Sequence, residues 1–261
     1  MTERSLAIVT GASTGIGREL AIIAARHRYD LVVVANEPEI EEAAAHFRTL
    51  GAQVDAVNAD LSTTEGVDHL LEALRGRPVA ALMANAGTGL KGAFLDQNFV
   101  EARHVVDTNV TGTIYLLHRV GNMMREAGAG RILITGSIAG FMPGAYHAVY
   151  NASKAFMDNF SFALRAEVKE AGVTVTCLMP GATETDFFER ADFGDTKLAH
   201  APMDKAADVA KTGFDAMLRG DGDVVSGWLN KLQAAIALVT PSSVLAAAHA
   251  ALAKPGSASR S

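Results

Sequence analysis

The chain has 261 residues, of which 49% are hydrophobic and 20% charged, as expected for a globular protein of one domain or at most two. Its formal net charge of −6 argues against nucleic acid as a main partner, and its single cysteine excludes an internal disulfide or a cysteine-based metal site, so we expect no bound metal. No signal-peptide pattern opens the chain and no apolar run reaches the ~18 residues of a membrane span, so we expect a cytoplasmic protein without a transmembrane segment.

Short apolar runs alternate with longer helical patterns along the chain. The runs predict buried strands over Leu6–Thr10, Leu31–Ala35, Val54–Val57, Val79–Ala84, Arg131–Thr135, Val173–Met179 and Asp223–Ser226. The longer patterns predict helices over Ile16–Arg28, Glu39–Leu50, Thr64–Arg75, Val100–Glu126, Tyr150–Ala171 and Lys205–Arg219. This alternation predicts an α/β fold, a doubly wound parallel sheet of about seven strands with helices on both faces. We expect one domain over residues 1–254.

A glycine-rich turn follows the first expected strand. It reads Thr10-Gly11-Ala12-Ser13-Thr14-Gly15-Ile16-Gly17 and opens a helix. Glycines permit positive φ and a close backbone approach, while a helix N-terminus offers free N–H groups to a phosphate. The Gly-x₃-Gly-x-Gly spacing differs from the general Gly-x-Gly-x-x-Gly fingerprint. The turn favours dinucleotide binding over an ordinary tight turn.

Tyr150 and Lys154 lie four residues apart on an expected helix, and Ser137 lies thirteen residues upstream. Positions i and i+4 share one helix face, so the phenol and the ammonium group should lie side by side. A nearby cation favours the phenolate, and we therefore expect Lys154 to lower the pKa of Tyr150. The pair predicts a proton-transfer group, although such pairs also occur on solvated helix faces.

Taken in chain order, these motifs resemble the short-chain dehydrogenase/reductase family, in its typical single-domain branch. The resemblance rests on the glycine turn, Asp60-Leu61, Asn85-Ala86-Gly87, Asn109, Ser137, Tyr150, Lys154, Pro180-Gly181, Thr183 and Thr185. It implies a Rossmann-like fold and an NAD(P)-dependent oxidoreductase that interconverts a ketone or aldehyde and an alcohol. A non-catalytic dinucleotide sensor and a sugar-nucleotide epimerase on the same fold are the alternatives.

The resemblance implies four catalytic residues. Tyr150 would be the general acid in reduction and the general base in oxidation, while Lys154 would contact the nicotinamide ribose and lower the tyrosine pKa. Ser137 would hydrogen-bond the substrate oxygen, and Asn109 would hold a water that links Lys154 to solvent. Simpler roles exist for three of them: Ser137 could cap the turn before Ile138, Asn109 could bond to backbone, and Lys154 could be a solvated charge.

The resemblance also implies a cofactor site along the carboxyl edge of the sheet. Asp60 would meet the adenine amino group unless it belongs to a surface turn, Asn85-Ala86-Gly87 would lie near the adenine ribose or stabilise the sheet, and Thr185 would hold the carboxamide. The complete expected set is Gly11, Ser13, Thr14, Gly15, Ile16, Gly17, Asn36, Asp60, Leu61, Asn85, Ala86, Gly87, Tyr150, Lys154, Pro180, Gly181, Thr183 and Thr185.

The choice between NAD(H) and NADP(H) should depend on the end of the second strand. Asn36 is neutral, and no arginine stands there to bind a 2′-phosphate. Glu37 would repel that phosphate only if its side chain turns inward. The sequence therefore leans slightly towards NAD(H).

The segment Glu184–Met203 is expected to form a mobile helical substrate lid with an apolar inner face. Its aromatic residues are Phe187, Phe188 and Phe193, and Phe141 and Met142 are further candidates for the pocket wall. We expect a lipophilic ketone, aldehyde or secondary alcohol as substrate. We expect His147 to lie at the surface or in the pocket wall.

The C-terminal part departs from the usual pattern of the family. Residues 227–254 predict a helical extension: Trp228, Leu232, Ile236 and Val239 fall at near-helical spacing, and Pro241 opens a second helix over Ser242–Ala253. A flap that covers the core is the first interpretation, with a subunit contact or a peripheral membrane face as alternatives. Residues 255–261 should form a flexible tail. We expect a homodimer or higher homo-oligomer through the two long helices.

Overall fold

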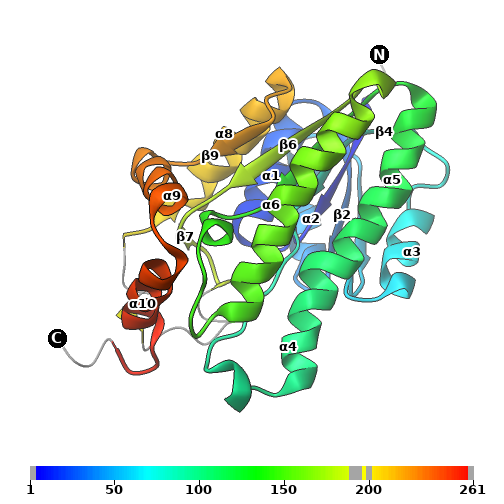
Figure 1. Cartoon of the computed structure of the whole chain (residues 1–261). Coiled ribbons are helices and arrows are strands. Elements are labelled where there is room, and N and C mark those ends of the chain that lie inside the picture. The colour runs from blue at the N-terminus through cyan, green and yellow to red at the C-terminus, as the bar shows by residue number, and fades with distance from the viewer. Residues whose placement is uncertain (1–3, 188–195, 198–201, 258–261) are drawn as a thin grey trace.

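The computed structural model describes residues 4–187, 196–197 and 202–257, and a seven-stranded sheet forms its centre (Figure 1). The strands are β1 (Ser5–Thr10), β2 (Tyr29–Ala35), β3 (Val54–Asn58), β4 (Val79–Ala84), β5 (Gly130–Thr135), β6 (Val173–Met179) and β9 (Asp223–Val225). They pair in parallel in the order β3-β2-β1-β4-β5-β6-β9. The predicted doubly wound sheet is confirmed, with strand ends shifted by one or two residues.

Helices cover both faces of this sheet. They are α1 (Gly15–Arg26), α2 (Ile40–Thr49), α3 (Thr64–Glu72), α4 (Phe99–Val106), α5 (Thr113–Ala127), α6 (Ala148–Val168), α8 (Ala206–Arg219), α9 (Trp228–Val239) and α10 (Ser242–Ala253). Short 3₁₀ segments are η1 (Phe94–Asp96), η3 (Ile138–Phe141) and η4 (Lys169–Ala171). One core lies between the sheet and α1, α2 and α8, and a second lies between the sheet and α3, α5 and α6.

The continuous apolar runs of the strands follow from these two cores. Successive side chains of a strand point to opposite faces. In β1, Val9 packs into the core beneath α1, while its neighbour Ile8 packs into the core beneath α5, and both are fully buried. Because helices cover both faces of the sheet, the side chains on both faces of each strand have to be apolar, and the strand appears in the sequence as a continuous apolar run.

The expected single helix Val100–Glu126 is wrong in one respect. The structure has α4, then a π-helical segment η2 (Asp107–Gly112), then α5. A Cβ atom at Gly112 would collide with the carbonyl oxygen of Leu61, so the backbone here passes directly against the loop after β3. Hydrophobic periodicity does not reveal one extra residue in a turn, which is why the sequence pattern predicts a plain α-helix.

Two features lie towards the C-terminus. A small parallel pair that the sequence pattern does not predict joins β7 (Thr183–Glu184) to β8 (Asp204–Lys205) at the two ends of the expected lid segment. The predicted C-terminal helices are present as α9 and α10, and Figure 1 shows them together at one side of the molecule. None of the helices in the described residues has the length and apolar character that a bilayer crossing requires.

Candidate active site

A cavity of about 760 Å³ opens at the carboxyl edge of the sheet, where ligands bind in open α/β folds. It runs from the glycine turn after β1, past the ends of β4 and β5, to α9 and α10. Of the predicted site residues, Gly17 and Asn109 do not line it. The others do: Gly11, Ser13, Thr14, Gly15, Ile16, Asn36, Asp60, Leu61, Asn85, Ala86, Gly87, Ser137, Tyr150, Lys154, Pro180, Gly181, Thr183 and Thr185.

The three glycines of the first turn do different things. Gly11 and Gly15 have φ of +65° and +55°, which side-chain-bearing residues rarely adopt. At Gly17, inside α1, an added Cβ would collide with the carbonyl oxygen of Gly11 and lie 2.6 Å from Nδ2 of Asn85. The first two therefore shape the turn, and the third lets α1 begin close against it. The side chain of the N-cap residue Thr14 does not cap the helix, and Thr14, Gly15 and Ile16 at this end of α1 line the cavity.

The outer end of the cavity holds an inward-facing carboxylate. Ser13 Oγ donates a hydrogen bond of 2.8 Å to Glu37 Oε2, so the Glu37 side chain turns towards the glycine turn. Asp60 also lines the cavity, but its Oδ1 accepts from Ser62 N at 2.9 Å within a local turn. The turn that was the alternative for Asp60 is thus present, and its expected contact with the adenine amino group stays a prediction.

Asn85 joins three neighbouring strands. Its backbone N–H donates to Thr10 Oγ1 at 2.9 Å, and its side-chain Nδ2 donates to the Thr10 carbonyl at 3.2 Å. The side-chain Oδ1 accepts from Thr135 Oγ1 at 3.1 Å. These bonds link the carboxyl ends of β1, β4 and β5. The expected sheet-stabilising role of this segment is therefore visible, and Asn85 also lines the cavity.

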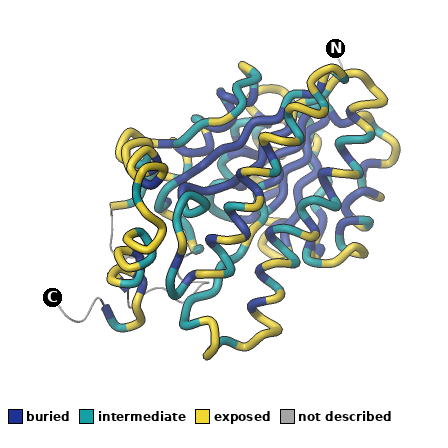
Figure 2. Tube along the Cα trace, viewed as in Figure 1, coloured by how far each residue is buried: buried dark blue, intermediate teal, exposed yellow. Residues whose placement is uncertain are grey.

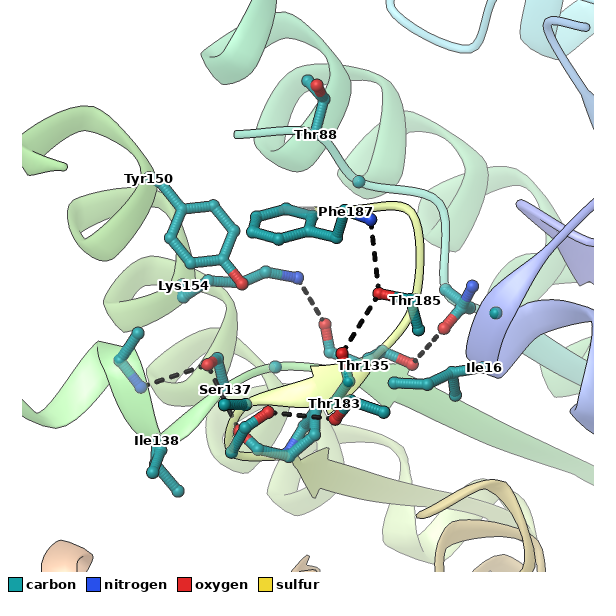
Figure 3. A pocket seen from close by; sticks show the side chains of 18 of the residues that line it. Ile16, Thr88, Thr135, Ser137, Ile138, Tyr150, Lys154, Thr183, Thr185 and Phe187 are labelled. Atoms are coloured by element: carbon teal, nitrogen blue, oxygen red, sulfur yellow. Dashed lines mark hydrogen bonds between the residues drawn. The ribbon is translucent and has the colours of Figure 1, made fainter. Parts of the chain in front are cut away.

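Tyr150, Lys154 and Ser137 converge in the middle of the cavity (Figure 3). Lys154 is buried, its Nζ donates to the Thr135 carbonyl at 2.8 Å, and Nζ lies 5.7 Å from the centre of the Tyr150 ring. Ser137 Oγ accepts from Ala139 N at 3.1 Å and donates to the Pro180 carbonyl at 3.3 Å. Ser137 therefore does cap its own turn, as the simpler interpretation has it, in addition to facing Tyr150.

The expected lowering of the Tyr150 pKa by Lys154 is wrong for this structure. Burial raises the pKa of Tyr150 to about 12, and a hydrogen bond with Ser137 offsets only part of that rise. Tyr150 is half-buried: the His147 ring stacks on its ring at 4.4 Å and the Phe187 ring lies 5.0 Å away, so two rings shield part of the phenol from water. The site therefore holds Tyr150 in its protonated form at neutral pH.

Asp158 is a site residue that the motifs do not mark. It lies one helical turn after Lys154 on α6 and is buried, and its Oδ1 accepts from Ser137 N at 3.2 Å. Burial raises the pKa of Asp158 to about 6 although the charge of Lys154 acts to lower it. Conversely, burial lowers the pKa of Lys154 and Asp158 opposes that shift. The second four-residue spacing, from Lys154 to Asp158, is the sequence signal that points to it.

Asn109 lies beneath the cavity wall. It belongs to η2 and is buried. Its Oδ1 accepts from Thr88 N at 2.8 Å, and its Nδ2 donates to the Thr88 carbonyl and to Ser153 Oγ, both at 2.9 Å. These bonds tie the loop after β4 to α6, next to Tyr150 and Lys154. The expected water-holding role stays a prediction.

The far end of the cavity is mostly apolar and is built by segments distant in sequence. Phe187 and Met142 line it as expected, whereas Phe141 packs against Ile138 and Met179 instead. The extension contributes Trp228, Leu229, Asn230, Gln233, Ile236, Ala237, Leu245, Ala248, His249 and Leu252. The remaining expected lid aromatics, Phe188 and Phe193, lie outside the described residues.

Two histidines meet in this apolar end. His147 lines the cavity, and burial together with the nearby His249 lowers the pKa of His147 to about 3. His249 Nδ1 lies 2.9 Å from the Ala145 carbonyl, which anchors α10 to the loop before α6. Of the two placements expected for His147, the pocket wall is correct, and the ring is neutral there.

In the described part of the chain, neither a metal site nor a reactive cysteine accompanies Tyr150, Lys154 and Ser137. No three His, Cys, Asp or Glu residues gather there into a set that could hold a metal ion. The thiol of Cys177 is buried in β6, and burial raises its pKa to about 12. Of the groups that line the cavity, the tyrosine, lysine and serine at its centre remain the ones whose arrangement suits proton transfer.

Comparison with known proteins gives concordant results. The family model for the short chain dehydrogenases matches residues 5–194. An uncharacterized oxidoreductase of Myxococcus xanthus is 31% identical over 251 residues, covering 93% of this chain and 95% of that protein. A short-chain dehydrogenase from Sphingobium yanoikuyae in complex with NADPH superposes with a TM-score of 0.80 at 27% identity, covering 88% of this chain and 93% of that one. A bulky-bulky ketone specific alcohol dehydrogenase from Comamonas testosteroni superposes with a TM-score of 0.76 at 27% identity, covering 90% and 92%.

Proposed function

Because the chain belongs to the short-chain dehydrogenase family, whose members are NAD(P)-dependent oxidoreductases, we propose that it reduces a ketone or aldehyde to an alcohol by hydride transfer. The observation that carries the proposal is the convergence of Tyr150, Ser137 and Lys154 in the same cavity that the glycine turn opens. The proposed proton donor Tyr150 and the proposed dinucleotide-binding turn thus line the same cavity.

The residues of the cavity fit a nicotinamide dinucleotide. Gly15 leaves room that a side chain would fill, since an added Cβ would lie 2.8 Å from Cγ2 of Thr185 across the cavity. The N-terminus of α1 would hold the pyrophosphate, Ser13 and Asn36 the adenosine side, and Lys154 with Thr183 and Thr185 the nicotinamide side. When bound, the nicotinamide supplies the hydride.

Tyr150 is the proton donor of the proposed reduction. Its hydroxyl is protonated at neutral pH, as a group that delivers a proton to a carbonyl oxygen must be. Ser137 Oγ would donate to the same oxygen while negative charge builds on it. In alcohol oxidation Tyr150 would have to start as the phenolate, which burial disfavours.

For the cofactor, we favour NAD(H). Glu37 turns inward and bonds to Ser13 at the ribose end of the cavity, which is the condition under which its charge opposes a 2′-phosphate. A carboxylate there repels the phosphate and can accept from a ribose hydroxyl. The Sphingobium yanoikuyae neighbour binds NADPH, so the preference of this chain has to come from its own residues.

For the substrate, we favour a lipophilic ketone. Beyond Tyr150 the wall includes Phe187 and Met142, joined by Ile236, Leu245 and Leu252 of the extension, with fewer polar residues among them. An apolar wall of this kind binds apolar groups on both sides of a carbonyl. The Comamonas testosteroni neighbour is described as specific for bulky ketones, which agrees with this choice.

We also propose a homodimer through the long helices, as the sequence predicts. On α6, Phe156 and Phe162 are 44% and 41% exposed, although both are large and apolar. Light scattering should give twice the mass of the chain, and a monomer at micromolar concentration would contradict the dimer.

The test is a panel of ketones and aldehydes with NADH and NADPH, followed by the absorbance of the reduced nicotinamide. Tyr150→Phe should lower turnover by about 10²–10⁴-fold, because the ring stays and only the proton donor is lost. NADH titration should give the same dissociation constant for variant and parent. Undiminished turnover in the variant would refute the role of Tyr150, and the absence of turnover on the whole panel would favour the sensor alternative.

A further inference from the structure

Helices α9 and α10 present apolar residues to solvent. Leu232, Leu238 and Val239 on α9 are 53%, 73% and 83% exposed, and Val244 on α10 is 54% exposed. None of these four residues lines the cavity, and we call them the outer face. Figure 2 shows that the two helices are exposed along most of their length. A surface helix normally turns polar residues outward, so this face is built to be covered.

The inner side of the same helices packs on the molecule and lines the cavity, and it carries polar as well as apolar groups. On α9, Asn230 donates to Asp204 and to the Ser226 carbonyl, and Gln233 lines the cavity. On α10, His249 is buried and lies against the Ala145 carbonyl. The inner side is thus occupied by packing and by the cavity, and the outer face is a separate apolar surface.

The charge of the extension differs in sign from that of the rest of the chain. Residues 227–261 contain Lys231, Lys254 and Arg260 and no aspartate or glutamate. With a net charge of −6 for the whole chain, the remaining residues carry −9. Lys231 on α9 and Lys254 directly after α10 are both exposed. Asp204 contacts the start of α9 through Asn230, but the extension itself carries lysines and no carboxylate side chain. An apolar surface on such helices is complementary to an anionic lipid surface.

We propose that the outer face of α9 and α10 binds the surface of an anionic membrane. A second copy fits less well, because a two-fold contact through this face would bring the same cations together. Trp228 stands at the border between the outer face and the cavity mouth, is 74% exposed, and belongs to the residue type that prefers the lipid–water interface.

Binding in this way would place the cavity mouth beside the lipid. Trp228, Ile236 and Leu252 line the cavity and remain 74%, 51% and 47% exposed, so the apolar wall continues to the outside. A lipophilic substrate could then enter from the membrane; this part rests on the proposed function. Membrane binding itself is measured without turnover, so its failure would leave the reductase activity untouched.

Trp228 is the only tryptophan of the chain, so its fluorescence reports on this surface alone. Vesicles of phosphatidylcholine with a quarter phosphatidylglycerol should shift its emission to shorter wavelengths, protect it from iodide and carry the protein into the pellet. Pure phosphatidylcholine vesicles should do so much less. Absence of a shift, or equal binding to both kinds of vesicle, would overturn the proposal. A shift on concentrating the protein without vesicles would assign the face to a second copy.

Variants separate the apolar and the charged contributions. The double variant Leu232→Glu/Val239→Glu should lower the vesicle partition coefficient about tenfold or more, because both side chains are exposed and would carry charge into the lipid. Lys231→Glu should lower it about fivefold or more. The matched controls are Met123→Glu and Lys169→Glu, which change exposed residues on α5 and η4, away from this face. Equal losses in the controls would also refute the assignment.

Discussion

Replacing Asp158 by asparagine measures how much the buried carboxyl group weakens the fold at neutral pH. Burial raises its pKa from 3.8 to about 6. The folded protein thus binds this proton more tightly than the unfolded chain does. The contribution to stability is complete below about pH 4 and is lost as the pH rises through about 6. A shift of about two pKa units corresponds to about 3 kcal/mol.

Asparagine has nearly the same shape, retains an oxygen to accept from Ser137 N–H, and does not titrate. The free energy of unfolding of Asp158→Asn, relative to the parent, should therefore rise by about 3 kcal/mol between pH 4 and pH 8. Any constant cost of altered hydrogen bonds cancels in this difference. Urea denaturation at the two pH values gives both numbers.

The control is Asp96→Asn, at an exposed carboxylate in η1. Its difference from the parent should change by less than about 0.5 kcal/mol over the same range. If the difference for Asp158→Asn is independent of pH, or falls as the pH rises, then burial does not dominate the energetics of this carboxyl group. The lowering of the Lys154 pKa by burial, with Asp158 opposing it, would then be in doubt as well.

Three further predictions concern the cavity. Ser137→Ala should lower turnover about 10²-fold, because in the proposed reaction the hydroxyl donates to the substrate oxygen. It should also lower the free energy of unfolding by about 1–2 kcal/mol, because the hydroxyl bonds to Ala139 N and the Pro180 carbonyl. Kinetics and denaturation test the two effects separately, and unchanged turnover contradicts the first. Glu37→Gln removes the charge and should bring the NADPH and NADH dissociation constants closer together, and Glu37→Arg should make NADPH the tighter ligand. Both predictions would fail if the parent protein bound NADPH about tenfold tighter than NADH, a difference of ~1.4 kcal/mol. Gly17→Ala should lower the free energy of unfolding by about 1–3 kcal/mol and weaken NADH binding, because the new Cβ would collide with the Gly11 carbonyl oxygen. Gly121→Ala is the control: its new Cβ meets no atom within 4 Å, so it should stabilise the protein by about 0.5–1 kcal/mol. Equal melting temperatures for these two variants would refute the predicted collision at Gly17.

The sheet and most of the cavity wall are predictable because they rest on local signals. Strands buried on both faces are continuous apolar runs, and the glycine turn is contiguous in sequence. The environment of Tyr150 is not predictable in this way. The rings of His147 and Phe187 that surround it belong to different segments, so the spacing of Tyr150 and Lys154 predicts a lowered pKa where burial produces a raised one.

The C-terminal helices show the same limit. Their existence follows from the spacing of Trp228, Leu232, Ile236 and Val239, but spacing identifies an apolar stripe without saying which way it points. In the structure Leu232 and Val239 face outward, while Ile236 reaches the cavity. The pair β7–β8 joins two strands of two residues each, which is too short for any periodic pattern.

The π-helical segment η2 has an evolutionary consequence. A π turn holds one residue more than an α turn, so a one-codon deletion within Asp107–Gly112 would restore a plain α-helix between α4 and α5. Each residue advances an α-helix by about 100°, and the deletion would swing Asn109 away from Thr88 and Ser153. The support beneath Tyr150 and Lys154 can thus be gained or lost through a single insertion or deletion, with the codons of Tyr150 and Lys154 left intact.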